Sequence, residues 1–207
     1  MILSDVKAMN WRHGMNLDVL DLIKESSVNI AFADRNIQSM KKDIENLLSL
    51  DFEFVSQGDM KTILSELNEQ FKFDNYPQIM ADIINLLMRF KDVSEVKEFK
   101  LSLTTVSTNM CRRFHVDVNH LRLLCTYEGP GTLWLEDDNV NRTALNNFED
   151  NDQIILDPER IRQVSTGAVI ILKGEKYAND GITGAVHKSP AIEESGETRL
   201  ILRIDSL

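Results

Sequence analysis

The stretch CRRFHVDVNHLRLLCTYEGPGTLW, Cys111–Trp134, places two histidines and an aspartate within six residues and then continues directly into an apolar run. That run, LRLLCTY at 121–127, is short, leucine-rich and closed by a Gly-Pro-Gly turn signal, which is typical of a β-strand. His115 and Asp117 stand two residues apart, and on a strand such residues point the same way. The stretch therefore indicates a β scaffold that carries either a metal site or only polar residues at the mouth of one strand.

The chain around this stretch, from residue 96 to the C-terminus, consists of short β-rich runs separated by Gly, Asn, Asp and Pro. These runs predict a sheet or barrel. They are LSLTTV (101–106), LRLLCTY (121–127), TLWL (132–135), QIIL (153–156), AVIIL (168–172) and RLILRI (199–204). The acidic segment EDDNVNRTALNNFEDND, 136–152, is a long irregular insert, to be interpreted either as a solvated loop or as a lid beside a pocket.

The first 95 residues have a different pattern, in which apolar residues recur at helical spacing. Three amphipathic helices are expected within 37–48, 60–71 and 79–90. Asn36 and Asp59 stand where N-caps would, and Pro77 suits a first helical turn because its missing N–H would have no partner there. A short alternation at 28–32 predicts one strand ahead of the helices.

Helices first and short strands afterwards predict an α+β protein. We expect a single domain, 1–207, in which a mainly helical portion, 1–95, packs on a C-terminal β jelly roll, 96–207. No internal repeat or low-complexity linker separates the two portions. They are therefore expected to pack together and not to move on a tether.

Composition excludes several classes of partner. The formal net charge is -10, from 33 acidic and 23 basic residues, so a nucleic-acid footprint has no support, and an anionic membrane surface is equally disfavoured. No apolar run approaches the roughly 18 residues needed to cross a bilayer. The two cysteines, Cys111 and Cys125, lack a zinc-knuckle spacing, and the first residues lack the pattern of a secretory signal. A reducing, cytoplasmic setting is the resulting expectation.

The histidines of the opening stretch raise the possibility of a metal centre. An octahedral metal that must also hold a substrate and dioxygen needs three protein ligands on one face, and two histidines with one carboxylate supply them. His115 and Asp117 can provide two ligands from one strand face. The third must arrive from a distant strand, and His187 in GAVHKSP is the available histidine downstream. His120 lies three residues from Asp117 and has the wrong parity for that face.

The final strand carries a second signal. In TRLILRID, Arg199 and Arg203 share one face with Ile201, while the leucines between them share the other. An arginine that faces inward from a strand buried on both sides is costly unless its charge meets an anion. A dicarboxylate would be such an anion, because the planar guanidinium binds a carboxylate through two parallel hydrogen bonds. The alternative is a sheet edge whose arginines lie in water.

The combination CRRFHVD, LRLLCTYEGPGTLW, LKGE, GAVHKSP and RLILRID closely resembles the bacterial family called domain of unknown function 1826, from about Met110 to the C-terminus. More distantly, the HxD motif, the later histidine and the arginine twelve residues beyond it resemble the iron(II)/2-oxoglutarate-dependent dioxygenases. Those enzymes are built on a double-stranded β-helix. The resemblance implies that His115, Asp117 and His187 are iron ligands and that Arg199 binds 2-oxoglutarate. Tyr127 is a candidate to hydrogen-bond the keto acid, with a packed core tyrosine as the alternative.

Three classes of function follow from these patterns. The resemblance implies an iron(II)/2-oxoglutarate-dependent oxygenase that hydroxylates a small molecule or a protein side chain. The second class is a non-oxidative, cupin-like protein that binds zinc, iron or another divalent metal. The third is a catalytically inactive interaction domain. Arg199 separates the first two, because a plain metal-binding protein has no need of an inward arginine. The substrate and the oligomeric state are not determined by the sequence.

Overall fold

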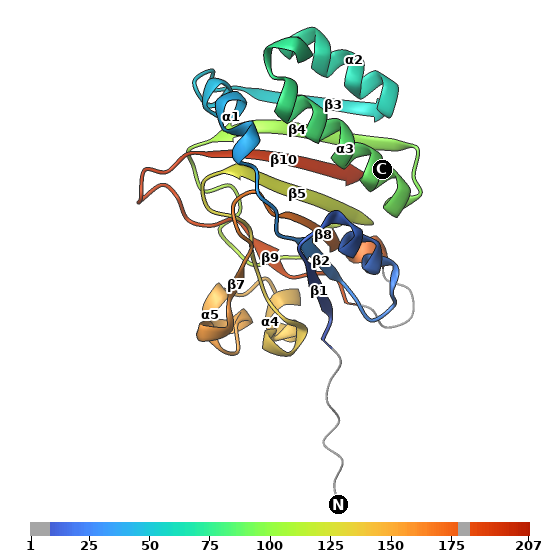
Figure 1. The fold of residues 1–207 in the computed structure, drawn as a ribbon. Coiled ribbons are helices and arrows are strands. Elements are labelled where there is room, and N and C mark those ends of the chain that lie inside the picture. The colour runs from blue at the N-terminus through green and yellow to red at the C-terminus, as the bar shows by residue number, and fades with distance from the viewer. Residues whose placement is uncertain (1–8, 178–182) are drawn as a thin grey trace, which may run out of the picture.

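The computed structural model describes residues 9–177 and 183–207, which form a large sheet, a small sheet and two groups of helices (Figure 1). Every pair of neighbours in the large sheet is antiparallel except β1 and β2. In spatial order its strands are β1 (Trp11–Gly14), β2 (Ile30–Ala33), β8 (Val169–Lys173), β5 (Leu121–Glu128), β10 (Arg199–Ser206), β4 (Glu98–Val106) and β3 (Glu53–Asp59). The small antiparallel sheet has the order β7 (Arg162–Gln163), β6 (Leu133–Trp134) and β9 (His187–Lys188).

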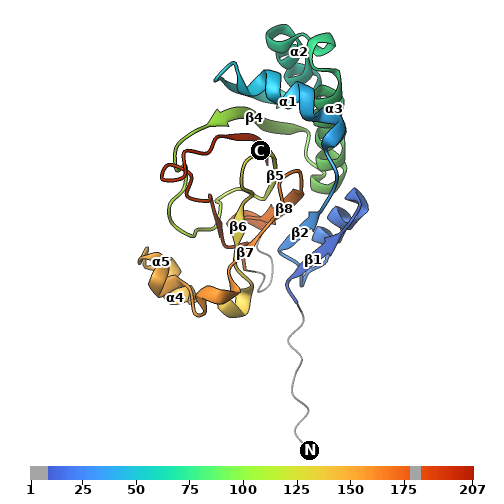
Figure 2. The same cartoon turned by 60° about the vertical axis from the view of Figure 1, so that its left-hand side comes forward.

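Three helices, α1 (Lys41–Leu48), α2 (Met60–Phe71) and α3 (Pro77–Ser94), cover one face of the large sheet (Figure 2). Their boundaries follow local chemistry. Asp59 caps α2 by accepting a hydrogen bond from the Thr62 N–H at 2.8 Å, and Pro77 occupies the first turn of α3. The three helices predicted from apolar spacing are therefore confirmed, but Asn36 is not the N-cap of the first. Its Oδ1 accepts from the Gln38 N–H at 2.8 Å, and α1 begins at Lys41 without a side-chain cap.

The strands of the large sheet present alternate side chains to two different cores. Leu123 and Cys125 of β5 and Leu202 of β10 pack under the helices in the larger core. Leu124 and Ile201 belong to a second core, together with Trp134 of the small sheet. The small sheet therefore lies on the face of the large sheet opposite the helices, and the space between the two sheets is where polar side chains of β5 and β10 meet.

The acidic insert is folded and contains the short helices α4 (Arg142–Asn146) and α5 (Asn151–Ile154). Leu145 and Ile154 pack with Phe114, just ahead of His115, in a small core of their own. The insert thus packs directly against the segment that carries the HxD motif. Its helices α4 and α5 are labelled in Figure 1.

Two expectations need correction. The run QIIL, 153–156, does not form the predicted strand, because α5 ends within it and Ile155 makes only an isolated bridge to Val140. A four-residue apolar run fits either helix or strand, and packing decides between them. The first 95 residues also supply β1 and β3, which apolar alternation did not predict. In β3 only Phe54 and Ser56 are buried, so the strand has a weak hydrophobic signal.

No helix in the described part of the chain is both long enough and apolar enough to cross a lipid bilayer.

Candidate metal centre

His115 and His187 are brought together by their backbones. Each donates its N–H to the carbonyl oxygen of the other at 3.0 Å, which places the segment around His115 beside β9. Residues paired in this way carry their side chains on the same face, and the two imidazole rings lie with centroids 4.6 Å apart. Trp134 of β6 is the partner of His187 on the other side, so the three side chains form one row across the small sheet.

Both imidazoles are oriented by main-chain carbonyl groups. Nδ1 of His115 lies 3.0 Å from the Arg113 oxygen, and Nδ1 of His187 lies 3.1 Å from the Ala185 oxygen. A carbonyl oxygen only accepts, so each Nδ1 carries a proton. The contact with Asp117 raises the pKa of His115, and in the neutral form of either ring the lone pair lies on Nε2, where a metal would take the place of a proton. This is the arrangement that orients metal-binding histidines in proteins.

Asp117 completes the cluster. Its Oδ2 lies 3.3 Å from His187 Nε2, and its Oδ1 lies 3.7 Å from His115 Nε2. One ligand atom from each of the three residues falls within 4.8 Å of the others. Among the described residues, the buried Oδ2 has no hydrogen-bond partner. Two imidazoles and a carboxylate with an oxygen that lacks a hydrogen-bond partner therefore lie close enough to bind one ion, and they are a donor set that a divalent cation accepts.

The carboxylate of Asp117 is fixed from behind by Arg122 at the start of β5. Arg122 Nη1 donates to Asp117 Oδ1, while its Nε donates to Asp205 Oδ1 at 2.6 Å. Burial alone would raise the pKa of Asp117, but its contacts with His115, His187 and Arg122 outweigh burial and hold that pKa well below the usual range. Asp117 is therefore ionised, and Oδ2 is the oxygen left for a metal.

The cluster opens into a cavity of about 60 Å³ between the two sheets, which has room for a few water molecules. His115 and His187 lie in its wall. Three cationic side chains also line it, namely Arg122, Arg203 and Lys188. The exposed residues Met110 and Cys111 also line the cavity. The cavity is thus small, positively charged and bounded on one side by an exposed segment.

Arg199 lies on the same face of β10 as Ile201 and Arg203, as alternation predicts, and it is only 1% exposed. Its Nη2 donates to Thr126 Oγ1 at 3.0 Å, and its buried Nε has no partner among the described residues. Burial lowers the pKa of Arg199 to about 10. The Gly129 turn packs against it: at φ +78° a Cβ there would meet the Thr198 oxygen at 2.6 Å and Arg199 Cγ at 2.9 Å. The structure therefore holds a buried guanidinium tightly, with no ion-pair partner among the described residues.

Tyr127 is not brought to the cluster, which corrects the suggestion that it binds a cofactor there. Its side chain lies on the helix-covered face of the large sheet, where its hydroxyl donates to Asp82 Oδ2 at 2.7 Å. Asp82 also holds Arg35 through two hydrogen bonds of 2.5 and 2.8 Å. Tyr127 therefore belongs to a buried polar network under the helices, separated from the metal centre by the sheet.

A second, larger hollow of about 680 Å³ lies on the outer side of the cluster. His115 lines both this groove and the inner cavity. The acidic insert supplies one wall of the groove, including Leu145 and Phe148, and the HxD segment supplies Val116 and Val118. A molecule in this groove can approach the His115 side of the cluster without entering the inner cavity.

Arg122, Lys188 and Asp205 were missed by reasoning from the sequence. Alternation along LRLLCTY does place Arg122 on the face opposite Cys125, and alternation along RLILRID places Asp205 beside Arg203. The sequence therefore indicates the face on which each of these two side chains lies. The register between β5 and β10, which pairs Arg122 with Asp205, is seen only in the structure. Lys188 follows His187 directly and carried no separate signal.

Comparison with known proteins gives one family and several distant structural likenesses. The family model described as "Protein of unknown function (DUF1826)" matches residues 14–205. A search of curated proteins finds no match. A Pseudomonas putida prolyl-4-hydroxylase is 10% identical over 91% of this chain and 95% of its own, with a TM-score of 0.49. A bsmA homolog from Methylobium petroleophilum is 8% identical over 91% of each chain, with a TM-score of 0.45. A cupin protein from Bacteroides fragilis is 9% identical over 52% of this chain and 64% of its own, with a TM-score of 0.30. None of these likenesses assigns a reaction to this chain.

Proposed function

Because the chain belongs to the family described as protein of unknown function (DUF1826), whose description names no reaction, we propose its function from the geometry of its site. The protein is an iron(II)- and 2-oxoglutarate-dependent oxygenase, with His115, Asp117 and His187 as the metal ligands. The observation that carries this proposal is that one ligand atom from each of His115, Asp117 and His187 lies within 4.8 Å of the others, with both imidazoles fixed through Nδ1 and Asp117 Oδ2 without a hydrogen-bond partner among the described residues.

Strand order supports a double-stranded β-helix as the scaffold. In chain order, β4, β5, β8 and β10 belong to the large sheet, where they are neighbours in the order β4-β10-β5-β8. Between them the chain crosses to the small sheet, at the His115 segment after β4, at β6 and β7 after β5, and at β9 after β8. Such alternation between two facing sheets encloses a space lined by both, which is where jelly rolls bind ligands.

The donor set fits iron(II). Two imidazoles and one carboxylate on one face leave the remaining octahedral positions for other ligands, and no thiolate is among them. Arg122 occupies Oδ1 of Asp117, so the carboxylate presents one oxygen to the metal. His115 and His187 are held in the correct tautomer by the carbonyl groups of Arg113 and Ala185.

Charge inside the fold supports a dianionic cosubstrate. Arg122, Arg203 and Lys188 line the cavity, and Arg199 lies beyond Ile201 on the same face. Within the described chain, the carboxylates that form ion pairs with this set are Asp117 and Asp205, and both are engaged by Arg122. A guanidinium buried without an anion is destabilising. We therefore assign Arg199 to a carboxylate of 2-oxoglutarate, which would pair with it through two hydrogen bonds.

With iron(II) and 2-oxoglutarate bound, the site would couple decarboxylation of the keto acid to hydroxylation, so that substrate, dioxygen and 2-oxoglutarate give hydroxylated product, succinate and carbon dioxide. The protein's own contribution is placement and charge. Asp117 and the two histidines would hold the metal, Arg199 and Arg203 would neutralise the cosubstrate, and the buried Trp134 and Ile201 would help to keep water out. Arg199 is not among the residues that line the cavity of about 60 Å³, so binding of 2-oxoglutarate to Arg199 would require side chains of the cavity wall to move.

The test is cosubstrate turnover. Metal-free protein supplied with iron(II), ascorbate, oxygen and 2-oxoglutarate is expected to form succinate slowly even without a substrate, and to stop when iron is omitted. The measurement is succinate by mass spectrometry together with oxygen uptake. A protein that binds iron(II) tightly but neither binds nor consumes 2-oxoglutarate would instead be the non-oxidative metal-binding alternative.

A further inference from the structure

The groove on the outer side of the cluster has the size and position of a substrate site. Its volume of about 680 Å³ lies within the range of small-molecule sites, and His115 forms part of its floor. Apolar and charged side chains share its wall, namely Val116, Val118, Leu145, Phe148, Arg113 and Glu175. A molecule held there would present one end to the metal centre.

Phe148 is the unusual residue in this wall. It follows α4 in a left-handed conformation, with φ of 61°. The Phe148 N–H donates to the Leu145 oxygen at 3.2 Å and the Glu149 N–H to the Ala144 oxygen at 3.0 Å, which is the hydrogen-bond pattern that normally has glycine at this position. A bulky side chain is strained there, and strain of this kind is concentrated at functional sites. The ring is nevertheless 79% exposed, so core packing does not account for it.

Two other helices in the described chain also end at a residue with positive φ, and they provide a comparison for Phe148. Lys72 after α2 has φ of 56° and Glu95 after α3 has φ of 59°. Both are polar side chains that lie in water, and an exposed polar residue at a helix end needs no further explanation. Phe148 differs because it presents a large apolar surface to solvent in a groove that His115 also lines.

Arg113 supplies the charge that accompanies Phe148. Its guanidinium carbon lies 4.9 Å from the centroid of the Phe148 ring, and its Nη1 donates to the Glu149 main-chain oxygen at 3.4 Å. No carboxylate in the described residues forms an ion pair with it. The other groove arginine, Arg142, is already satisfied by Asp137 and the Gly184 oxygen. Arg113 is also tied to the metal centre, because its carbonyl group orients His115. A guanidinium that lacks a carboxylate partner and lies against an exposed ring is suited to a ligand that is both flat and anionic.

We propose that this groove binds the primary substrate, and that the substrate is a small organic acid whose aromatic ring stacks on Phe148 while its carboxylate pairs with Arg113. The inference rests on the proposed function, because it takes the metal centre beside His115 as the reacting site. The small exposed apolar area of the groove favours a small molecule over a protein partner. The only strongly exposed apolar side chains among the described groove residues are Phe148 and Val118, which is too little for a stable protein interface.

The first measurement is the affinity of the metal-free protein for 3-phenylpropionate, L-phenylalanine and 2-phenylethylamine, with ligand-observed NMR as the readout. 3-Phenylpropionate is expected to bind and the amine is not, whereas L-phenylalanine distinguishes two kinds of acid. Binding of 3-phenylpropionate alone identifies a simple acid. Binding of L-phenylalanine that weakens in Glu175→Gln identifies an amino acid. Arg113→Gln is expected to weaken 3-phenylpropionate at least about tenfold.

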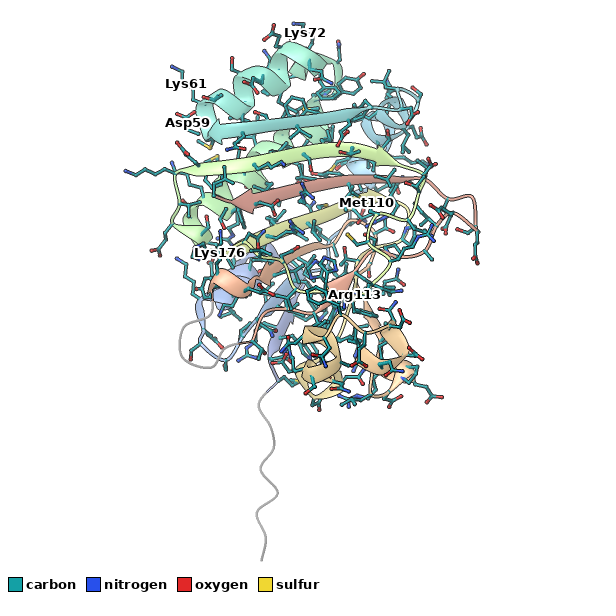
Figure 3. All side chains as sticks on the ribbon, turned by 180° about the vertical axis from the view of Figure 1, so that it is seen from behind. Asp59, Lys61, Lys72, Met110, Arg113 and Lys176 are labelled. Carbon is teal, nitrogen blue, oxygen red and sulfur yellow. The ribbon has the colours of Figure 1, made fainter. Side chains whose placement is uncertain are left out.

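Phe148→Gly separates a ligand-binding role from a structural one. Glycine relieves the backbone strain, so the thermal midpoint is expected to rise or stay unchanged while affinity for 3-phenylpropionate falls about tenfold. Lys72→Gly is the matched control, since it relieves the same strain at a helix end that Figure 3 shows far from Arg113. It is expected to leave the affinity unchanged.

Loading the triad with Mn(II) then locates the ligand, because the ring protons of bound 3-phenylpropionate are expected to relax faster through the paramagnetic ion. Equal affinity for acid and amine, no loss in Phe148→Gly, or binding without enhanced relaxation in protein that holds Mn(II) would each overturn the inference. If the chain does not bind Mn(II) at all, the proposed function fails, whereas the affinity series on metal-free protein still tests the groove.

Discussion

Replacing Asp117 by asparagine is expected to weaken Fe(II) or Mn(II) binding by at least about 100-fold while α1–α3 remain folded. Asp117 is the only anionic member of the triad, and its Oδ2 is the atom that lacks a partner in the described structure. An amide of the same shape removes the charge and offers a much poorer ligand. Even outer-shell partners of metal ligands contribute about 10- to 100-fold to affinity, so loss of a direct ligand should cost at least as much.

The matched control for this substitution is Asp34→Asn. Asp34 contacts His13 at 2.8 Å in a half-exposed pair outside the cavity, so the same chemical change is made at another histidine–aspartate contact. Metal affinity is measured by calorimetry and folding by circular dichroism. Asp117→Asn also removes one of the two carboxylate partners of Arg122, which should cost about 1–3 kcal/mol of stability. If Asp117→Asn binds Mn(II) as tightly as Asp34→Asn does, Asp117 is not a ligand.

Arg199→Met is expected to abolish detectable 2-oxoglutarate binding without weakening the metal-free protein. Arg199 is 1% exposed and makes one side-chain hydrogen bond within the described chain, to Thr126. Because burial lowers its pKa to about 10, the protonated form is disfavoured by the fold. That penalty is present in full below pH 10 and is relieved only as pH rises toward the unfolded value. At neutral pH an apolar side chain of similar length removes it, so we expect stability to rise by about 1 kcal/mol, or roughly 2–4 °C in Tm.

A gain in stability together with a loss of ligand would show that Arg199 is retained for binding, because a structural arginine would give the opposite stability change. Tyr127→Phe is the companion variant. It removes the hydrogen bond to Asp82 on the helix-covered face, so it should reduce stability by about 1 kcal/mol and leave 2-oxoglutarate affinity unchanged. Arg199→Met with normal 2-oxoglutarate affinity, or with a large loss of metal-free stability, would contradict the assignment.

The alternation of side chains between the two faces of a strand made much of the site predictable from sequence. His115 and Asp117 share a face because they stand two apart, and Arg199 shares a face with Ile201 for the same reason. The same rule places Tyr127 on the face of Cys125, opposite Arg122, and the structure shows both residues in the core under the helices. Alternation therefore predicts the position of Tyr127 better than the hydrogen-bonding chemistry of its hydroxyl does.

Other features depend on tertiary structure and had no local signal. The pairing of His115 with His187 joins segments 72 residues apart, and only the scarcity of histidines downstream and the family resemblance pointed to that partner. β3 was missed because only one of its buried residues is strongly apolar. The left-handed conformation of Phe148 could not be read from the sequence, because glycine is the residue expected there.

The most direct test is an anaerobic titration of the protein with iron(II) and then 2-oxoglutarate, followed by visible absorption. If the triad holds iron(II) with open positions, addition of 2-oxoglutarate should produce the weak charge-transfer band of a chelated keto acid, which saturates at one equivalent and is absent from Asp117→Asn. Iron(II) that stays unbound, or an identical band in Asp117→Asn, would contradict a metal centre built from His115, Asp117 and His187.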